Sequence, residues 1–128
     1  MNVLLDTCTF LWIISDSPEL SLPAREVFQS PANDVYLSSV STWEIAVKHS
    51  LGRLPLPQVP QIFVPEQRKC HGIASLLLSE EATLNLPKLP DWHRDPFDRM
   101  LICQALSGNF TLLTPDAEIH RYPVNCCW

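Results

Sequence analysis

Four acidic residues in this chain follow apolar runs or open helical patterns, and their carboxylates could bind one metal ion. Asp6 and Asp116 each end a pattern typical of a buried strand. Glu44 and Asp98 lie in the first turns of two predicted helices. In an open α/β sheet the carboxyl ends of the strands and the adjoining helix N-termini share one edge. The four acids therefore predict one divalent-cation site assembled from distant parts of the chain.

Glu44 and Asp98 each lie at the start of a row of apolar residues along one face of a predicted helix. Asp98 is followed by apolar residues three, four and seven positions later, and Glu44 is followed at such spacings by Val47 and Leu51. These spacings place side chains on one helix face. An isolated buried carboxylate is costly, so each acid must be metal-bound, paired, hydrogen-bonded or protonated.

Each acid can also be explained by a role within its own helix or turn. The residue pattern alone does not decide between such local roles and a shared metal site. Glu44 can complete a helix cap or pair with Lys48 four residues later. Asp98 can complement the dipole of its helix, and Asp116 can cap the next helix. Asp6 can be a turn residue after an edge strand. Their joint placement is what favours a shared site.

Residues near the four acids are weaker candidates for contacts with metal-bound water or with phosphate. Thr7 and Thr114 flank acids and can orient water or phosphate, or can serve only as turn partners. The basic candidates are Lys48, His93, Arg94 and Arg99. Lys48 and Arg99 can equally form ordinary pairs with neighbouring acids. Asp95 fits a helix N-cap better than a metal ligand.

The composition is that of one globular domain, which we expect to span residues 1–128. The chain is 46% hydrophobic and 18% charged, unlike a disordered segment. A net charge of −5 argues against a generally basic nucleic-acid surface, but the four proposed ligands account for most of it. Overall charge therefore neither supports nor excludes RNA.

Five cysteines without CxxC spacing favour a reduced cytosol. We expect Cys8 and Cys103 to be small buried residues without a functional role, whereas Cys126 and Cys127 could oxidise. The chain start lacks a basic signal region, and no apolar run approaches the roughly 20 residues that span a bilayer. We expect a soluble cytoplasmic protein that does not enter a membrane.

Short apolar runs alternate with helical patterns along the chain. The first half predicts a strand at 3–5, a helix at 7–15, a helix from Ser21, a strand at 35–37 and a helix ending near Gly52. The spacing of Ser41 and Glu44 is that of a capping box, which would open the last of these helices. The apolar run 10–14 can supply a docking face or simply be buried in the core.

Prolines are frequent in the second half of the chain. Those in the segment 54–64 predict a surface excursion rather than a strand or a helix. The later expected elements are an apolar run at 73–78, a helix at 80–86 stopped by Pro87, a helix from Pro96 to Gly108, a strand to Thr114, a short helix and a strand near Val124. This alternation predicts a three-layer α/β/α domain with a central, mainly parallel sheet.

Residues 93–105 read HRDPFDRMLICQA, and this block resembles the HRDPFDR signature of VapC-like toxins, a group of the PIN-domain family. Shorter blocks at 4–7, 41–48 and 112–116 support the resemblance, which covers essentially the full length. The family's acidic set maps onto Asp6, Glu44, Asp98 and Asp116. Cys103 stands where related chains often have alanine, which should alter the packing only slightly.

The resemblance implies a Mg²⁺-dependent endoribonuclease of a toxin–antitoxin module, in which Mn²⁺ could replace Mg²⁺. Asp6, Glu44 and Asp98 would anchor the catalytic ion, and Asp116 would complete the pocket or bind a second ion through water. The products would carry 3′-hydroxyl and 5′-phosphate ends. The resemblance also implies a homodimer and a cognate VapB-like antitoxin as partner.

Two other classes of function are compatible with parts of this pattern. A haloacid-dehalogenase-like phosphatase also has an Asp after its first strand, but it needs a second acid two residues later, where this chain has Cys8. A non-catalytic PIN-like domain that binds RNA or a protein partner is the better rival. The presence of all four acids favours the nuclease. The sequence does not identify the RNA.

Overall fold

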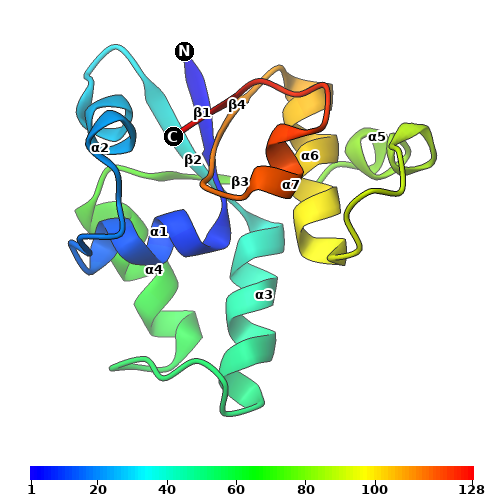
Figure 1. Ribbon diagram of the computed structural model, residues 1–128. Coiled ribbons are helices and arrows are strands. Elements are labelled where there is room, and N and C mark those ends of the chain that lie inside the picture. The colour runs from blue at the N-terminus through cyan, green and yellow to red at the C-terminus, as the bar shows by residue number, and fades with distance from the viewer.

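A five-stranded parallel sheet forms the centre of the computed structural model, which describes residues 1–128 (Figure 1). The strands are β1 (Asn2–Leu5), β2 (Asp34–Ser38), β3 (Ala74–Leu76), β4 (Thr111–Leu113) and β5 (Cys126–Cys127). Their order across the sheet is β3-β2-β1-β4-β5, and every neighbouring pair is parallel. The N-terminal strand β1 is therefore central, and its C-terminal end lies between those of β2 and β4.

Helices cover both faces of the sheet. They are α1 (Thr7–Ile14), α2 (Leu22–Gln29), α3 (Ser39–Ser50), α4 (Pro60–Cys70), α5 (Glu80–Thr83), α6 (Pro96–Gly108) and α7 (Ala117–His120). In Figure 1, α1, α2 and α4 lie on one side of the sheet, and α5, α6 and α7 lie on the other. The predicted three-layer α/β/α architecture is confirmed.

The sheet separates two hydrophobic cores because successive side chains of a strand point to opposite faces. Val3 and Leu5 belong to the core that also contains residues of α1, α2 and α4. Leu4, between them, belongs to the core that contains residues of α6 and α7. The apolar run 10–14 contributes to the first core, in which Phe10 is fully buried. Leu11, Trp12 and Ile14 are only partly buried against this core, so core burial accounts for only part of the run.

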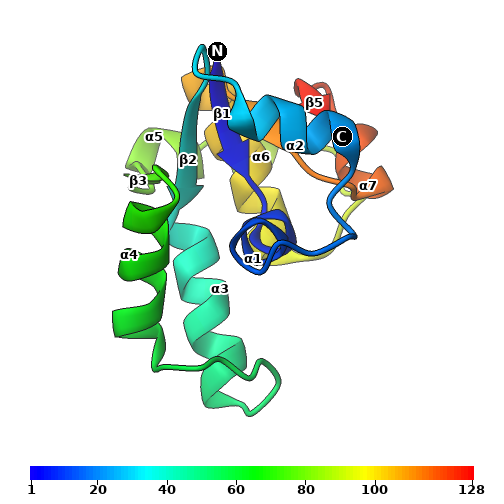
Figure 2. The ribbon, with the colours of Figure 1, turned by 90° about the vertical axis from the view of Figure 1, so that its left-hand side faces the viewer.

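Helix α3 extends beyond the edge of the sheet beside α4, as Figures 1 and 2 both show. The capping box predicted at Ser41 is wrong, because the helix begins earlier. Ser38 is the N-cap, and its Oγ accepts a hydrogen bond from the Val40 N–H at 2.9 Å. Glu44 is therefore beyond the first turn. Leu51 is 61% exposed, so the predicted apolar stripe ends before it.

The surface excursion predicted at 54–64 is wrong in its second half, where α4 begins. Pro60 occupies the first turn of α4, a position at which its missing N–H costs no helical hydrogen bond. Phe63 and Val64 follow and are buried in the first core. Pro65 then lies inside the helix, so prolines were misleading here as signs of irregular structure.

The other differences are small. The helix predicted at 80–86 ends at Thr83, and Pro87 lies in a 3₁₀ turn at Leu86–Lys88. The last strand begins at Cys126 rather than near Val124. All five cysteines are free thiols, and Cys103 is buried as predicted. None of the helices has the length and apolar character needed to span a membrane.

Candidate metal and nuclease site

The four acids predicted as ligands lie at the C-terminal edge of the sheet or on the two helices beside it. Asp6 follows β1 and caps α1, while Asp116 follows β4 and caps α7. Asp98 lies in the first turn of α6, and Glu44 lies in α3. The predicted N-cap role of Asp116 is confirmed. The expectation that Asp6 is a turn residue after an edge strand is wrong, because β1 is the central strand and Asp6 caps the helix that follows it. Each capping bond uses one carboxylate oxygen, so capping alone leaves the other oxygen of each residue for a further partner.

Asp6 is buried, with 4% of its surface exposed, and is held by three donors. Its Oδ1 accepts from the Thr9 N–H at 2.8 Å and from the Cys8 Sγ at 3.3 Å. Its Oδ2 accepts from the Thr114 Oγ1 at 2.5 Å. The same hydroxyl accepts from the Asp116 N–H at 3.1 Å. Thr114 therefore links two of the proposed ligands.

Glu44 is equally buried and is held by one hydroxyl and one ammonium group. The Thr7 Oγ1 donates to Oε1 at 2.6 Å, and the Lys48 Nζ donates to Oε2 at 2.5 Å. The hydrogen bond to Glu44 raises the pKa of Lys48 even though partial burial lowers it. Lys48 therefore stays charged as the positive partner of Glu44, as one of the two interpretations of this residue predicted.

Asp98 and Asp116 converge on the imidazole of His93. The His93 Nε2 lies 2.9 Å from Asp98 Oδ2 and 3.2 Å from Asp116 Oδ2. One ligand atom from each of these three residues lies within 4.8 Å of the other two. His93 was predicted to contact RNA phosphate, so its direct contact with two acids was missed. Nothing in the sequence spacing indicated it.

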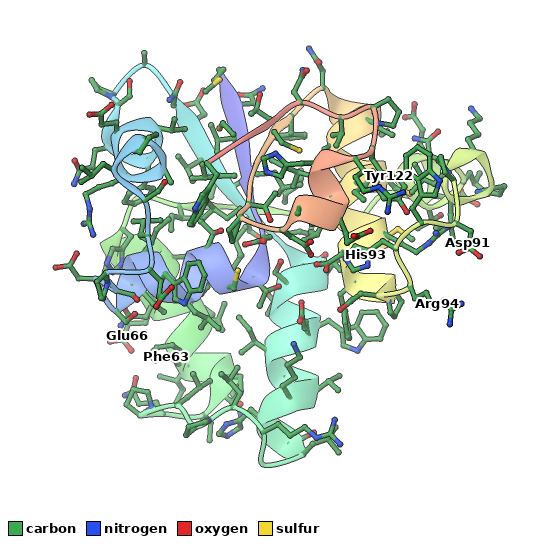
Figure 3. The ribbon with its side chains drawn as sticks, in the orientation of Figure 1. Phe63, Glu66, Asp91, His93, Arg94 and Tyr122 are labelled. Carbon is green, nitrogen blue, oxygen red and sulfur yellow. The ribbon has the colours of Figure 1, made fainter.

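The loop that carries His93 is fixed from both sides of the residue. The His93 N–H donates to the Tyr122 Oη at 2.8 Å, and the His93 carbonyl accepts from Arg99 at 3.1 Å. The Tyr122 hydroxyl and Arg99 also donate to the Pro90 carbonyl. Figure 3 shows Tyr122 beside this loop and Arg94 pointing away from it. The role of Tyr122 had no signal in the sequence.

Negative charge is concentrated around Asp98. Burial, followed by the nearby carboxylate of Asp95, raises the pKa of Asp98 to about 7, and Asp6 and Glu44 contribute in the same direction. His93 opposes the increase. The carboxylates of different elements are thus close enough to repel one another, which is the condition a bound cation would relieve.

The remaining candidate residues, Asp95, Arg99 and Arg94, have different surroundings in the structure. Asp95 caps α6 as predicted, accepting from the N–H groups of Phe97 and Asp98 at 2.8 and 3.2 Å. Arg99 pairs with Asp91 at 3.3 Å besides binding the loop carbonyls, so its predicted pairing with a nearby acid is confirmed. Arg94 is exposed and lines a cavity of about 480 Å³ next to the start of α6.

Cys8 differs from its prediction. It is only partly buried and donates its thiol hydrogen to Asp6. Burial, together with the neighbouring Asp6 carboxylate, raises the pKa of this thiol well above its usual range. Cys8 is therefore a neutral donor beside the site rather than a passive core residue.

A sequence model of the PIN domain matches residues 3–125. This chain belongs to the PIN domain family. Its relatives include Ribonuclease VapC16 of Mycobacterium tuberculosis, which is 30% identical over 106 residues, covering 80% of this chain and 68% of that protein. The resemblance to VapC-like proteins is thereby confirmed, whereas the finer assignment to an HRDPFDR subgroup stays a prediction.

Solved structures share the fold of this PIN domain. A chain of VapBC2 from Rickettsia felis, bound to a DNA fragment from their promoter, superposes with a TM-score of 0.74 at 16% identity, covering 99% of this chain and 98% of that chain. A chain of VapBC-1 from nontypeable Haemophilus influenzae gives 0.67 at 20% identity, with coverages of 99% and 97%. At these identities the comparison supports the fold.

Proposed function

We propose that this PIN domain, formed by residues 1–128, is a metal-dependent endoribonuclease and the toxin of a VapBC-type module. Its relationship to a VapC ribonuclease supports the activity. The observation that carries the proposal is the convergence of separate carboxylates on one sheet edge, where burial and neighbouring acids raise the pKa of Asp98 to about 7. Such a gathering of acids is expected where a cation belongs to the active protein.

The donor chemistry fits Mg²⁺, with Mn²⁺ as a substitute. We assign Asp6, Glu44, Asp98 and Asp116 as ligands because their carboxylate oxygens are the hard donors these ions prefer. A bound cation of this kind lowers the pKa of its water and stabilises negative charge on a phosphate. The expected products have 3′-hydroxyl and 5′-phosphate ends.

Neighbouring side chains fix the ligands in place. Thr114 and the α1 backbone restrain Asp6, and Thr7 and Lys48 restrain Glu44. Because these donors are already oriented, the carboxylates need little reorganisation when charge develops on a phosphate. We therefore assign Thr7 and Thr114 to positioning the acids rather than to contact with RNA.

Arg94 is our candidate for phosphate contact. It is exposed, has no hydrogen-bond partner within the chain, and lines the cavity of about 480 Å³ together with Arg99. Arg99 is less available, because Asp91 and two loop carbonyls already occupy its guanidinium group. Guanidinium groups bind phosphate through paired hydrogen bonds. The cavity next to α6 would then accept the RNA backbone.

We further propose that the protein is a cytoplasmic homodimer whose activity a VapB-like antitoxin blocks. Solved relatives of the fold are VapBC complexes, which supports an antitoxin partner. Light scattering of the purified toxin at micromolar concentration should give the mass of a dimer. A monomer under these conditions would contradict the homodimer.

Cleavage of total cellular RNA tests the nuclease. Antitoxin-free protein should cut RNA at discrete positions with Mg²⁺ or Mn²⁺ and should stop when EDTA is added. The variants Asp6→Asn and Asp98→Asn should lose this cleavage while remaining folded. Glu66→Gln is a matched control, because Glu66 is exposed on α4 and lies far from His93 in Figure 3.

The alternative is a non-catalytic PIN-like domain that binds RNA or a protein partner. Folded, metal-loaded protein that cuts none of these RNAs would favour that alternative. Full activity in Asp6→Asn would instead retain the nuclease but remove Asp6 from its metal site.

A further inference from the structure

We propose that His93 is a nitrogen ligand of the same cation, completing with Asp98 and Asp116 a mixed site that prefers Mn²⁺ to Mg²⁺. The proposal rests on the proposed function only in requiring that a divalent cation binds among the four acids. It adds a residue outside the acidic set and names the class of ion selected.

The distances within this cluster match those between ligands of one ion. Two neighbouring ligands of an octahedral ion, each about 2.1 Å from it, lie about 3 Å apart. The Nε2 of His93 lies 2.9 Å from Asp98 Oδ2 and 3.2 Å from Asp116 Oδ2. Each of these two distances is that of neighbouring ligands of one ion, and the ligand atoms of all three residues lie within 4.8 Å of one another.

The backbone fixes the position from which the imidazole reaches the acids. Tyr122 binds the N–H of His93 and Arg99 binds its carbonyl, so the residue is restrained on both sides. Its side chain is largely buried, with 16% of its surface exposed, and Figure 3 labels it in the part of the molecule that also holds Tyr122 and Arg94. A histidine that only bound RNA at the surface would not need these two backbone hydrogen bonds.

The Nε2 of His93 faces two carboxylates, so without an ion it donates its hydrogen to them, and a bound ion would take the place of that hydrogen. The other ring nitrogen, Nδ1, faces only the Asp95 N–H at 3.5 Å, beyond the usual range of a hydrogen bond. That weak contact does not prevent Nδ1 from carrying the hydrogen when Nε2 binds the ion. Imidazole nitrogen suits transition-metal ions, whereas Mg²⁺ prefers oxygen donors and retains water. A nitrogen donor at this position therefore favours Mn²⁺.

Pulsed electron paramagnetic resonance of the purified full-length protein with Mn²⁺ tests the proposal directly. The bound Mn²⁺ should show ¹⁴N coupling of a coordinated imidazole, and the coupling should change to that of ¹⁵N when only the histidines are labelled. The coupling should be absent from His93→Ala and His93→Gln. His71→Ala is the control, because His71 lies at the end of α4 and contacts Gln67.

Calorimetric titrations with Mn²⁺ and Mg²⁺ give the selectivity. Since losing even an outer partner of a metal ligand weakens binding by about 10- to 100-fold, both His93 variants should bind Mn²⁺ at least about tenfold more weakly. Their affinity for Mg²⁺ should fall by a smaller factor. Melting curves establish that each variant is folded.

Three results would overturn the assignment. They are Mn²⁺ bound without histidine nitrogen coupling, tighter Mn²⁺ binding by the His93 variants, and no Mn²⁺ binding by the unmodified chain. Tighter binding would mean that the imidazole N–H competes with the ion for Asp98 and Asp116. The spectra are independent of turnover, so a protein that binds Mn²⁺ through His93 but cuts no RNA would refute only the nuclease.

Discussion

A single hydroxyl group, that of Thr114, restrains two of the four proposed ligands. It donates to Asp6 and accepts from the backbone of Asp116. Because Thr114 is fully buried, water cannot replace its hydroxyl as a hydrogen-bond partner of Asp6 and Asp116 without a cost in free energy. The placement of two proposed metal ligands thus depends on a residue that is not itself a proposed ligand.

We expect Thr114→Val, which keeps the side-chain shape, to lower RNA cleavage at least about tenfold, because Asp6 and Asp116 lose a shared partner. Unfolding free energy should fall by about 1–3 kcal/mol, since a buried carboxylate oxygen loses its donor. Cleavage rates and urea denaturation measure the two effects. Thr42→Val, on α3, is the control and should keep full activity. Equal activity of the two variants would contradict this role.

Asp98 should make the stability of the metal-free protein depend on pH. Its pKa is raised from 3.8 to about 7 in the folded state, mainly by burial. Between these values the folded chain retains a proton that the unfolded chain releases, so stability should fall as pH rises from about 4 to 7. Denaturation in EDTA across this range should show the decrease, and Asp98→Asn should reduce it. An identical pH profile for the variant would refute the assignment.

The loop between the 3₁₀ turn and α6 is held by contacts with distant residues. Trp92 packs against Tyr122 with ring centroids 5.2 Å apart, and Arg121 lies over the Trp92 ring at 5.1 Å. Together with the Tyr122 hydroxyl, these contacts attach the loop to the segment that follows α7. The position of His93 is therefore set by the C-terminal part of the chain.

Tyr122→Phe should loosen this loop without unfolding the protein, because the ring stays packed and only the hydroxyl is lost. We expect faster amide hydrogen exchange at residues 91–95 and a several-fold lower rate of RNA cleavage. Exchange in β1 and β4 should be unchanged and serves as the internal control. Unchanged exchange in the loop would show that Arg99 alone is sufficient to hold it.

Local patterns predicted several helix starts correctly, although the local capping box at Ser41 was wrong. Asp95 followed by Pro96 marked the start of α6, and Ser21 marked that of α2. Helix α4 was missed because a proline in a first helical turn resembles a helix breaker. The contact of His93 with Asp116 spans 23 residues and depends on the path of the loop, so no local pattern contains it.

At the scale of the whole molecule, the fold brings like charges together, and cation binding should therefore stabilise it. Mg²⁺ or Mn²⁺ at 100 times its dissociation constant should add about 2.7 kcal/mol to the unfolding free energy if it binds only the folded chain. Thermal melts with either ion and with EDTA measure this change. Asp98→Asn should respond less, whereas Glu66→Gln should respond like the unmodified chain. No stabilisation at millimolar ion concentrations would contradict a built metal site.

The central position of β1 also bears on how the toxin is made. Asp6 is synthesised 108 residues before its partner Thr114, and β4 must pair beside β1 to bring the two together. A nascent chain lacking β4 has neither this hydrogen bond nor Asp116. Nuclease activity should thus arise only after the segment that carries Thr114 and Asp116 has been synthesised.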